Sequence, residues 1–175
     1  MNKRKVYVLL SDTGTLLTKL IGLFTGYPLN HASIAFDDEL REVYSFGRKR
    51  PNNPFIGGFV KEDIRSELFR NAPCEVYCFL VSDEEYNRMI QIVKQFESQQ
   101  HKYKYNFIGL FGILFNRKIE RKYAFFCSQF VATVISQSGV QVVDKAPNFV
   151  KPNDFTESAQ LHKIYQGELC EYKSK

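Results

Sequence analysis

The stretch Tyr123–Gly139, YAFFCSQFVATVISQSG, is the one around which we expect the fold to be organised. Its apolar residues include positions 127, 130, 131, 134 and 135, the spacing of a helix with one buried face. Gly139 is typical of the residue that follows a helix C-terminus. The aromatic residues before Cys127 indicate a short extended entry. The sequence therefore predicts that Cys127 lies in the first turn of the helix.

A cysteine at this position is a candidate nucleophile. The free N–H groups and partial positive charge of a helix N-terminus favour an anion, and can lower a thiol pKa below its free value of about 8.5. The alternative interpretation is a buried small apolar side chain, which is the commoner role of a lone cysteine. A base elsewhere in the chain has to decide between the two.

The alternating run Asn30–Phe36 contains the candidate base, His31. Period two places His31 and Ser33 on one face of a strand, and Arg41–Phe46 is expected to return as its hairpin partner after a turn at Asp37–Glu39. Small residues on the same face predict an open environment for the imidazole. An ordinary surface or cap histidine remains the alternative.

A cysteine at a helix N-terminus and a histidine on a strand form the minimum set for thiol catalysis. The imidazole takes the thiol proton, the thiolate attacks a carbonyl carbon, and the imidazolium returns the proton to the leaving group. In papain-like enzymes the cysteine precedes the histidine along the chain. Here the order is reversed.

Three segments resemble those of the circularly permuted papain-like hydrolases, the YiiX/YaeF type within the NlpC-like superfamily: Asn30–Phe36, Tyr44–Arg48 and Phe125–Val131. The resemblance implies a single α+β domain over residues 1–175, in which a small antiparallel sheet packs against helices and carries His31 against Cys127. It also implies thiol-dependent hydrolysis or transfer at an amide or ester carbonyl. Cys127 would be the nucleophile and His31 the base, acting on a small peptide-like or acylated substrate.

The resemblance also implies a third residue that orients the imidazole from the strand after the histidine, often a carboxylate. The matching position is Ser45, which a three-residue turn would place opposite His31, whereas other loop lengths would bring Tyr44 or Phe46 there. A serine offers no negative charge to the imidazolium, so Glu42 and Tyr44 stay as alternatives. The backbone N–H of Cys127 is the expected oxyanion donor, and the sequence does not identify a second.

Length and composition favour one globular domain: 175 residues, 44% hydrophobic and 25% charged. The net charge of +5 is spread among acidic residues, so we expect no nucleic-acid partner. The four cysteines lack zinc-pair spacing, and we expect neither a metal nor a cofactor. The first apolar run is too short for a signal peptide. A cytoplasmic protein is therefore expected, with no inference about its oligomeric state.

The apolar run Phe107–Phe115, flanked by lysines and arginines, has two interpretations. It could lie on a membrane, which would favour a lipid-directed acyl hydrolase or acyltransferase on the same fold. A buried helix is favoured, because the run has no polar face. A third function, a catalytically silent ligand-binding module, is motivated by serine at position 45.

The remaining expected elements are a central strand at Lys5–Leu10, a helix at Thr15–Thr25, a glycine-containing loop at Ile56–Val60, a strand at Cys74–Val81, a helix from the Ser82/Glu85 capping box to Gln99, a short strand at Val140–Val143, a short helix capped by Asp154 and a mobile tail at Glu168–Lys175.

Overall fold

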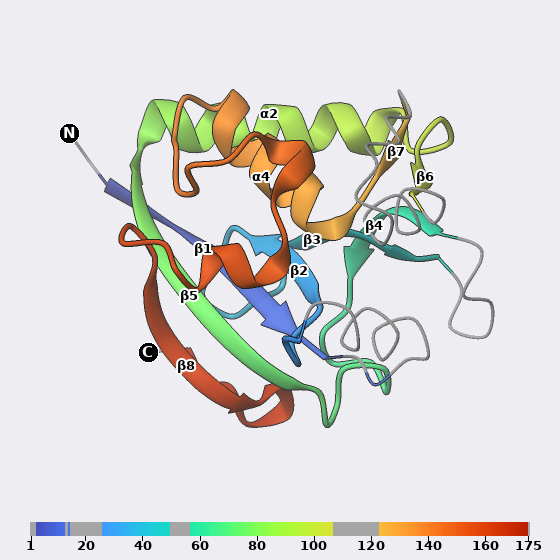
Figure 1. The fold of residues 1–175 in the computed structure, drawn as a ribbon, viewed down its shortest axis with the longest axis vertical. Coiled ribbons are helices and arrows are strands. Elements are labelled where there is room, and N and C mark those ends of the chain that lie inside the picture. The colour runs from blue at the N-terminus through green and yellow to red at the C-terminus, as the bar shows by residue number, and fades with distance from the viewer. Residues whose placement is uncertain (1–2, 13, 15–25, 50–56, 107–122, 175) are drawn as a thin grey trace.

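The computed structural model describes residues 3–12, 14, 26–49, 57–106 and 123–174. These residues form an α+β unit, in which a six-stranded antiparallel sheet carries α-helices on one face (Figure 1). The strand order is β4-β3-β2-β1-β5-β8, and β6 and β7 form a separate parallel pair.

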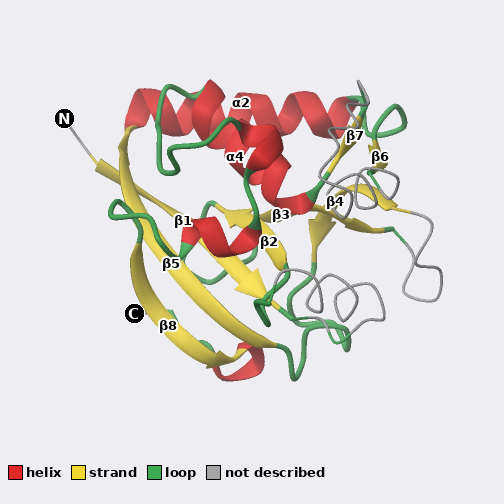
Figure 2. Ribbon diagram, in the orientation of Figure 1, coloured by secondary structure: helices red, strands yellow, loops and turns green. Residues whose placement is uncertain are grey.

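The strands are β1 (Lys3–Ser11), β2 (His31–Ala35), β3 (Val43–Arg48), β4 (Gly57–Glu62), β5 (Pro73–Ser82), β6 (Lys104–Tyr105), β7 (Ala124–Phe125) and β8 (His162–Glu168). The helices of the described residues are α2 (Asp83–Ser98) and α4 (Cys127–Gln137), with short 3-10 turns η1 (Pro147–Phe149), η2 (Pro152–Phe155) and η3 (Leu169–Glu171) (Figure 2).

The main core lies between the sheet and the two α-helices. The stripe expected on α4 is buried, and Phe130 and Val134 are fully inaccessible. Phe46 of β3 stands at the centre, with its ring centroid 5.3 Å from that of Phe130 and 5.9 Å from that of Phe96 on α2. Burying each such ring stabilises the fold by roughly 1.5–3 kcal/mol, so this cluster holds both helices on β3.

The opposite face of the sheet is covered by loop and tail residues. Cys74 and Cys78 are buried there with Leu9, against Phe69 and Leu169. Both cysteines are therefore packing residues. His31 and Ser33 belong to the same face, because Leu9 of β1 pairs with Ser33.

Several expectations are confirmed. The strand β1 is central, between β2 and β5, and the helix α2 begins with the expected capping box, in which Ser82 Oγ accepts from the N–H of Glu85 at 3.2 Å. The Glu85 carboxylate in turn accepts from the Ser82 N–H at 2.8 Å. These bonds satisfy two of the donors that a helix start leaves free.

Other expectations differ from the structure. Residues 140–143 do not form the expected strand, and the chain bends at 142–145. The edge strand β8 was not expected, because its exposed residues show no apolar alternation. Residues 57–60 belong to β4 instead of a loop. The tail is anchored at its start, where Leu169 is buried and its N–H donates to the Ala72 carbonyl. Asp154 caps η2 from inside the turn, by accepting from the Lys151 N–H.

The expected helix at 15–25 and the apolar run at 107–115 lie outside the described residues, so both interpretations of the latter remain predictions. Among the residues that are described, no helix has the length and apolarity needed to cross a membrane.

Candidate active site

Cys127 is the first residue of α4, as the sequence predicts. The short strand β7 leads into Phe126, whose N–H donates to Gln129 Oε1 at 3.3 Å, and the helix starts at once behind it. Cys127 is only 3% exposed. Its sulfur therefore lies inside the fold, at the end of a helix where N–H groups are free to stabilise an anion.

His31 is the first residue of β2, and its imidazole contacts a buried carboxylate. Nε2 of His31 lies 2.6 Å from Oε1 of Glu62, and both side chains are largely buried. Burial alone would lower the pKa of His31, but the Glu62 charge and a hydrogen bond with Cys127 raise it well above its usual value. The imidazolium form is therefore favoured.

The Cys127 sulfur lies 3.9 Å from the Asn30 carbonyl oxygen, and it is close enough to the His31 imidazole for each group to shift the pKa of the other. Because Nε2 of the ring is on Glu62, Nδ1 is the nitrogen left for the sulfur. Burial would raise the pKa of Cys127, yet His31 and the backbone N–H groups of Ala32 and Ser128 lower it below its ordinary value. The fold thus brings together the two side chains predicted from the sequence. The pKa of the Cys127 thiol is lowered, and that of the His31 imidazole is raised.

The sulfur reaches the ring where the sheet opens between β2 and β3. Their pairing comprises Ile34 with Tyr44 and Ala35 with Val43, and it does not continue to the start of β2. There the Ala32 carbonyl accepts from Ser45 Oγ at 2.7 Å, and the Ala32 N–H donates to the Cys127 sulfur. Both polar groups of Ala32 that a β3 ladder would have used are satisfied in other ways.

The expectation that Ser45 orients His31 is not what the structure shows. The turn after β2 is five residues long instead of three, since Phe36 N donates to Glu42 O and residues 37–41 form the loop. Continuing this register would place Gly47, not Ser45, opposite His31. The Ser45 hydroxyl is used instead on the backbone of Ala32.

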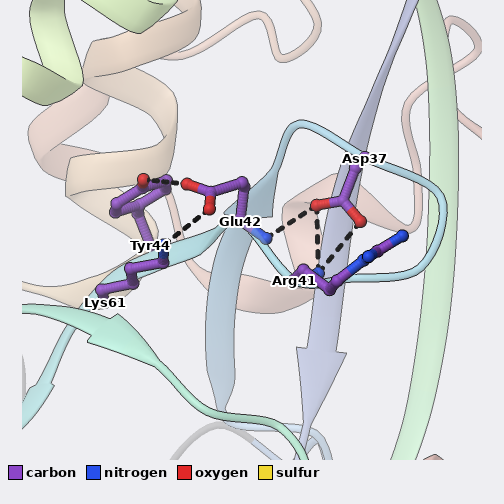
Figure 3. A network of polar contacts seen from close by, with 5 residues as sticks. All are labelled: Asp37, Arg41, Glu42, Tyr44 and Lys61. Atoms are coloured by element: carbon purple, nitrogen blue, oxygen red, sulfur yellow. Dashed lines mark hydrogen bonds and ion pairs between the residues drawn. The ribbon is translucent and has the colours of Figure 1, made fainter.

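The alternatives Glu42 and Tyr44 also lie in another part of the hairpin (Figure 3). The Tyr44 hydroxyl donates to Glu42 Oε2, and Lys61 Nζ lies 2.6 Å from Glu42 Oε1. The lysine and the tyrosine lower the pKa of Glu42, despite some burial. Asp37 holds the turn by accepting from the backbone N–H of Arg41 and of Glu42. This network stabilises the hairpin.

Glu62 is the functional residue that the sequence reasoning missed. It is the last residue of β4, a strand treated as loop because Gly57 and Gly58 open it. The signal was present, since Phe59, Val60, Lys61 and Glu62 include two apolar residues that a strand could bury, followed by a carboxylate. Only the tertiary pairing of β4 with β3 shows that this carboxylate meets His31.

Tyr105 is a second residue that the sequence did not identify. It ends β6, is 7% exposed, and its phenol lies close enough to Cys127 for the thiol to influence its pKa. Burial, followed by the nearby Cys127 charge, raises the pKa of the phenol well above its usual value. The Tyr105 hydroxyl therefore stays protonated and can donate a hydrogen bond to a group beside the sulfur.

Two glycines of β4 allow β6 to approach this closely. A Cβ at Gly57 would lie 2.7 Å from Tyr105 Cβ, and a Cβ at Gly58 would lie 2.7 Å from the Tyr103 carbonyl oxygen. Neither distance is compatible with a side chain. Gly57 and Gly58 thus leave the space in which Tyr105 and the Tyr103 backbone pack against β4.

Over the part of the chain that the structure describes, no three side chains of the metal-binding types gather into a site. No protein-family model, curated protein or solved structure matches the chain. The resemblance to permuted papain-like hydrolases therefore stays a prediction, and function has to follow from the geometry around Cys127.

Proposed function

We propose that the chain is a cysteine hydrolase that acts on an amide or ester carbonyl, of the kind found among permuted papain-like enzymes. The observation that carries this proposal is the continuous chain of contacts from Cys127 to His31 to Glu62. A helix-start thiol, an imidazole and a buried carboxylate in this order form the nucleophile, base and orienting group of covalent catalysis.

In the first half of the reaction, His31 takes the thiol proton and the Cys127 sulfur attacks the carbonyl carbon. A carbon–sulfur bond forms, and the carbonyl π electrons move to oxygen. Collapse of this tetrahedral species breaks the bond to the leaving amine or alcohol, which receives the proton from His31. The product is a thioester on Cys127.

In the second half, water attacks the thioester while His31 takes its proton. Collapse breaks the carbon–sulfur bond, releases the carboxylic acid product and returns the sulfur and the proton to their starting state. The Glu62 carboxylate contacts Nε2 of His31 and stabilises the imidazolium each time that it forms.

The oxyanion of both tetrahedral species needs donors beside the sulfur. The backbone N–H of Cys127 is one, at the free start of α4. The Tyr105 hydroxyl is the second, because it is buried beside the Cys127 thiol and keeps its proton there.

The proposal is tested by the pH dependence of Cys127 alkylation with iodoacetamide, read from the mass of the Cys127 peptide. The rate should rise at a lower pH than for a cysteine in a short unstructured peptide, because the thiolate is stabilised in the fold. Exposed Cys170 in the same chain is the control for reagent access. An electrophilic thiol-hydrolase probe should also form an adduct that Cys127→Ala abolishes. A profile like that of the free peptide, together with no adduct, would refute the proposal.

Tyr105→Phe should lower turnover of any ester substrate by roughly 10²-fold, the usual cost of one oxyanion donor, with little change in the pH profile of alkylation. Gly57→Ala should lower turnover similarly without removing the hydroxyl, since the new methyl group displaces Tyr105. Gly14→Ala, where φ is +63° and a Cβ would meet nothing within 4 Å, shows the effect of backbone strain without a steric clash. Equal turnover in wild type and Tyr105→Phe would remove Tyr105 from the oxyanion site.

A further inference from the structure

Ser33 holds the oxygen of Glu62 that His31 does not use. Ser33 Oγ donates to Oε2 of Glu62 at 2.5 Å, while Oε1 lies 2.6 Å from Nε2 of His31. Ser33 is fully buried, and the Glu62 side chain is 6% exposed. We propose that Ser33 is a positioning residue, whose hydroxyl fixes the Glu62 carboxylate in the orientation that keeps Oε1 on His31.

The arrangement follows from the period of β2. His31 and Ser33 are two residues apart, so their side chains stand next to each other on one face of the strand. Glu62 arrives from β4 and meets both with one oxygen each. On the intervening strand, Gly47 faces both side chains: a Cβ there would make ordinary van der Waals contact, 3.4 Å from Glu62 Oε1 and 3.6 Å from the His31 ring.

A buried carboxylate with one fixed oxygen can rotate about its last bond unless the other oxygen is also held. In water the solvent would occupy that oxygen, but here the described surroundings offer the Ser33 hydroxyl. Without it, Oε2 would compete with Oε1 for the imidazole, or the side chain would turn toward another donor. The His31 imidazole could then rotate away from the orientation in which it contacts both Cys127 and Glu62.

Among the residues that the structure describes, the titratable groups near His31 are the Glu62 carboxylate from β4, the Cys127 thiol from α4 and, beside that thiol, the Tyr105 phenol from β6. Ser33 itself does not titrate. A change at Ser33 can therefore alter the Cys127–His31 pair only through Glu62, or by disturbing the fold.

The test is Ser33→Ala in the full chain, with the pH profile of Cys127 alkylation by iodoacetamide as readout. We expect the rate at neutral pH to fall roughly tenfold, and the rise of the profile to move toward that of a free thiol, as one charge-assisted hydrogen bond is lost. Ser138→Ala is the matched control: Ser138 is also fully buried, and its Oγ donates to the Ile135 carbonyl at 2.6 Å, at the far end of α4. Its profile should equal that of the wild type.

A double variant separates positioning from general packing. If Ser33 acts through Glu62, then Ser33→Ala should change nothing further in a Glu62→Gln background. An equal shift in both backgrounds, or a folded Ser33→Ala with the wild-type profile, would overturn the inference. If Ser33→Ala does not fold, Ser33→Cys keeps the volume with only a weak donor, and a wild-type profile there would overturn it equally.

The inference rests on the proposed function, and the two can fail separately. A wild-type Cys127 that reacts like a free thiol would refute the proposed function itself. An activated wild-type thiol that Glu62→Gln weakens and Ser33→Ala leaves unchanged would refute only the role of Ser33.

Discussion

His31→Ala is expected to lower the rate of any reaction that consumes the Cys127 thiolate at neutral pH, with turnover falling by a factor of about 10³ or more. The imidazole lowers the pKa of the Cys127 thiol, and in the proposed mechanism it also returns a proton to the leaving group. Without it, burial, which raises the pKa of Cys127, is opposed by the backbone N–H groups of Ala32 and Ser128 and no longer by the imidazole. Steady-state turnover of an activated ester and the pH profile of alkylation both measure this loss.

The matched control is His162→Ala, a histidine at the exposed start of β8. It removes the same side chain from a site with no contact to Cys127, so both readouts should stay at the wild-type level. If His31→Ala and His162→Ala behaved alike, the imidazole beside the sulfur would have no role in activating it.

How much of this site can be predicted from the sequence depends on how far apart along the chain the interacting residues are. Cys127 and His31 were predicted correctly in position, because a helix stripe and a strand alternation are local patterns that a few neighbouring residues determine. Their meeting was predicted from a resemblance, and local pattern alone would not have supplied it.

The orienting residue was assigned to Ser45 because of one loop length. The loop at 37–41 contains Leu40 with φ of 53°, a left-handed conformation that few sequences signal at a leucine. The Asp37 carboxylate stabilises this turn by accepting hydrogen bonds from the backbone N–H groups of Arg41 and Glu42. Two additional turn residues shift the hairpin register, so Ser45 no longer lies opposite His31.

Glu62 and Tyr105 could not be predicted from their neighbours in the sequence. Each reaches the site through strand packing: β4 pairs with β3, and β6 packs against the glycine pair at the start of β4. Gly57 and Gly58 lie in the segment expected to be a loop, and no neighbouring residue indicates which strand packs against them. A charged or aromatic residue in a loop-like sequence gives no sign of a functional role. Only the tertiary contacts show that Glu62 and Tyr105 lie beside His31 and Cys127.

Glu62→Gln is expected to narrow the pH range of activity at both its lower and its upper limit. It should also lower the maximal activity by roughly 10²-fold or more. The active pair is a thiolate with an imidazolium. It forms as pH rises through the lowered pKa of Cys127, and it is lost as pH rises further through the raised pKa of His31. Removing the Glu62 charge lowers the pKa of His31, so the upper limit moves to lower pH. The thiolate then loses part of its charged partner, so the lower limit moves to higher pH.

Glu42→Gln makes the same chemical change at a carboxylate of the same sheet, whose partners are Tyr44 and Lys61 instead of His31 (Figure 3). Its pH profile should match the wild type. Glutamine at position 62 keeps the size of the side chain and one oxygen for the His31 N–H, so any difference between the two variants measures the charge and not the shape. A profile that Glu62→Gln shifts upward as a whole, without narrowing, would mean that Glu62 acts on Cys127 directly and not by stabilising the imidazolium.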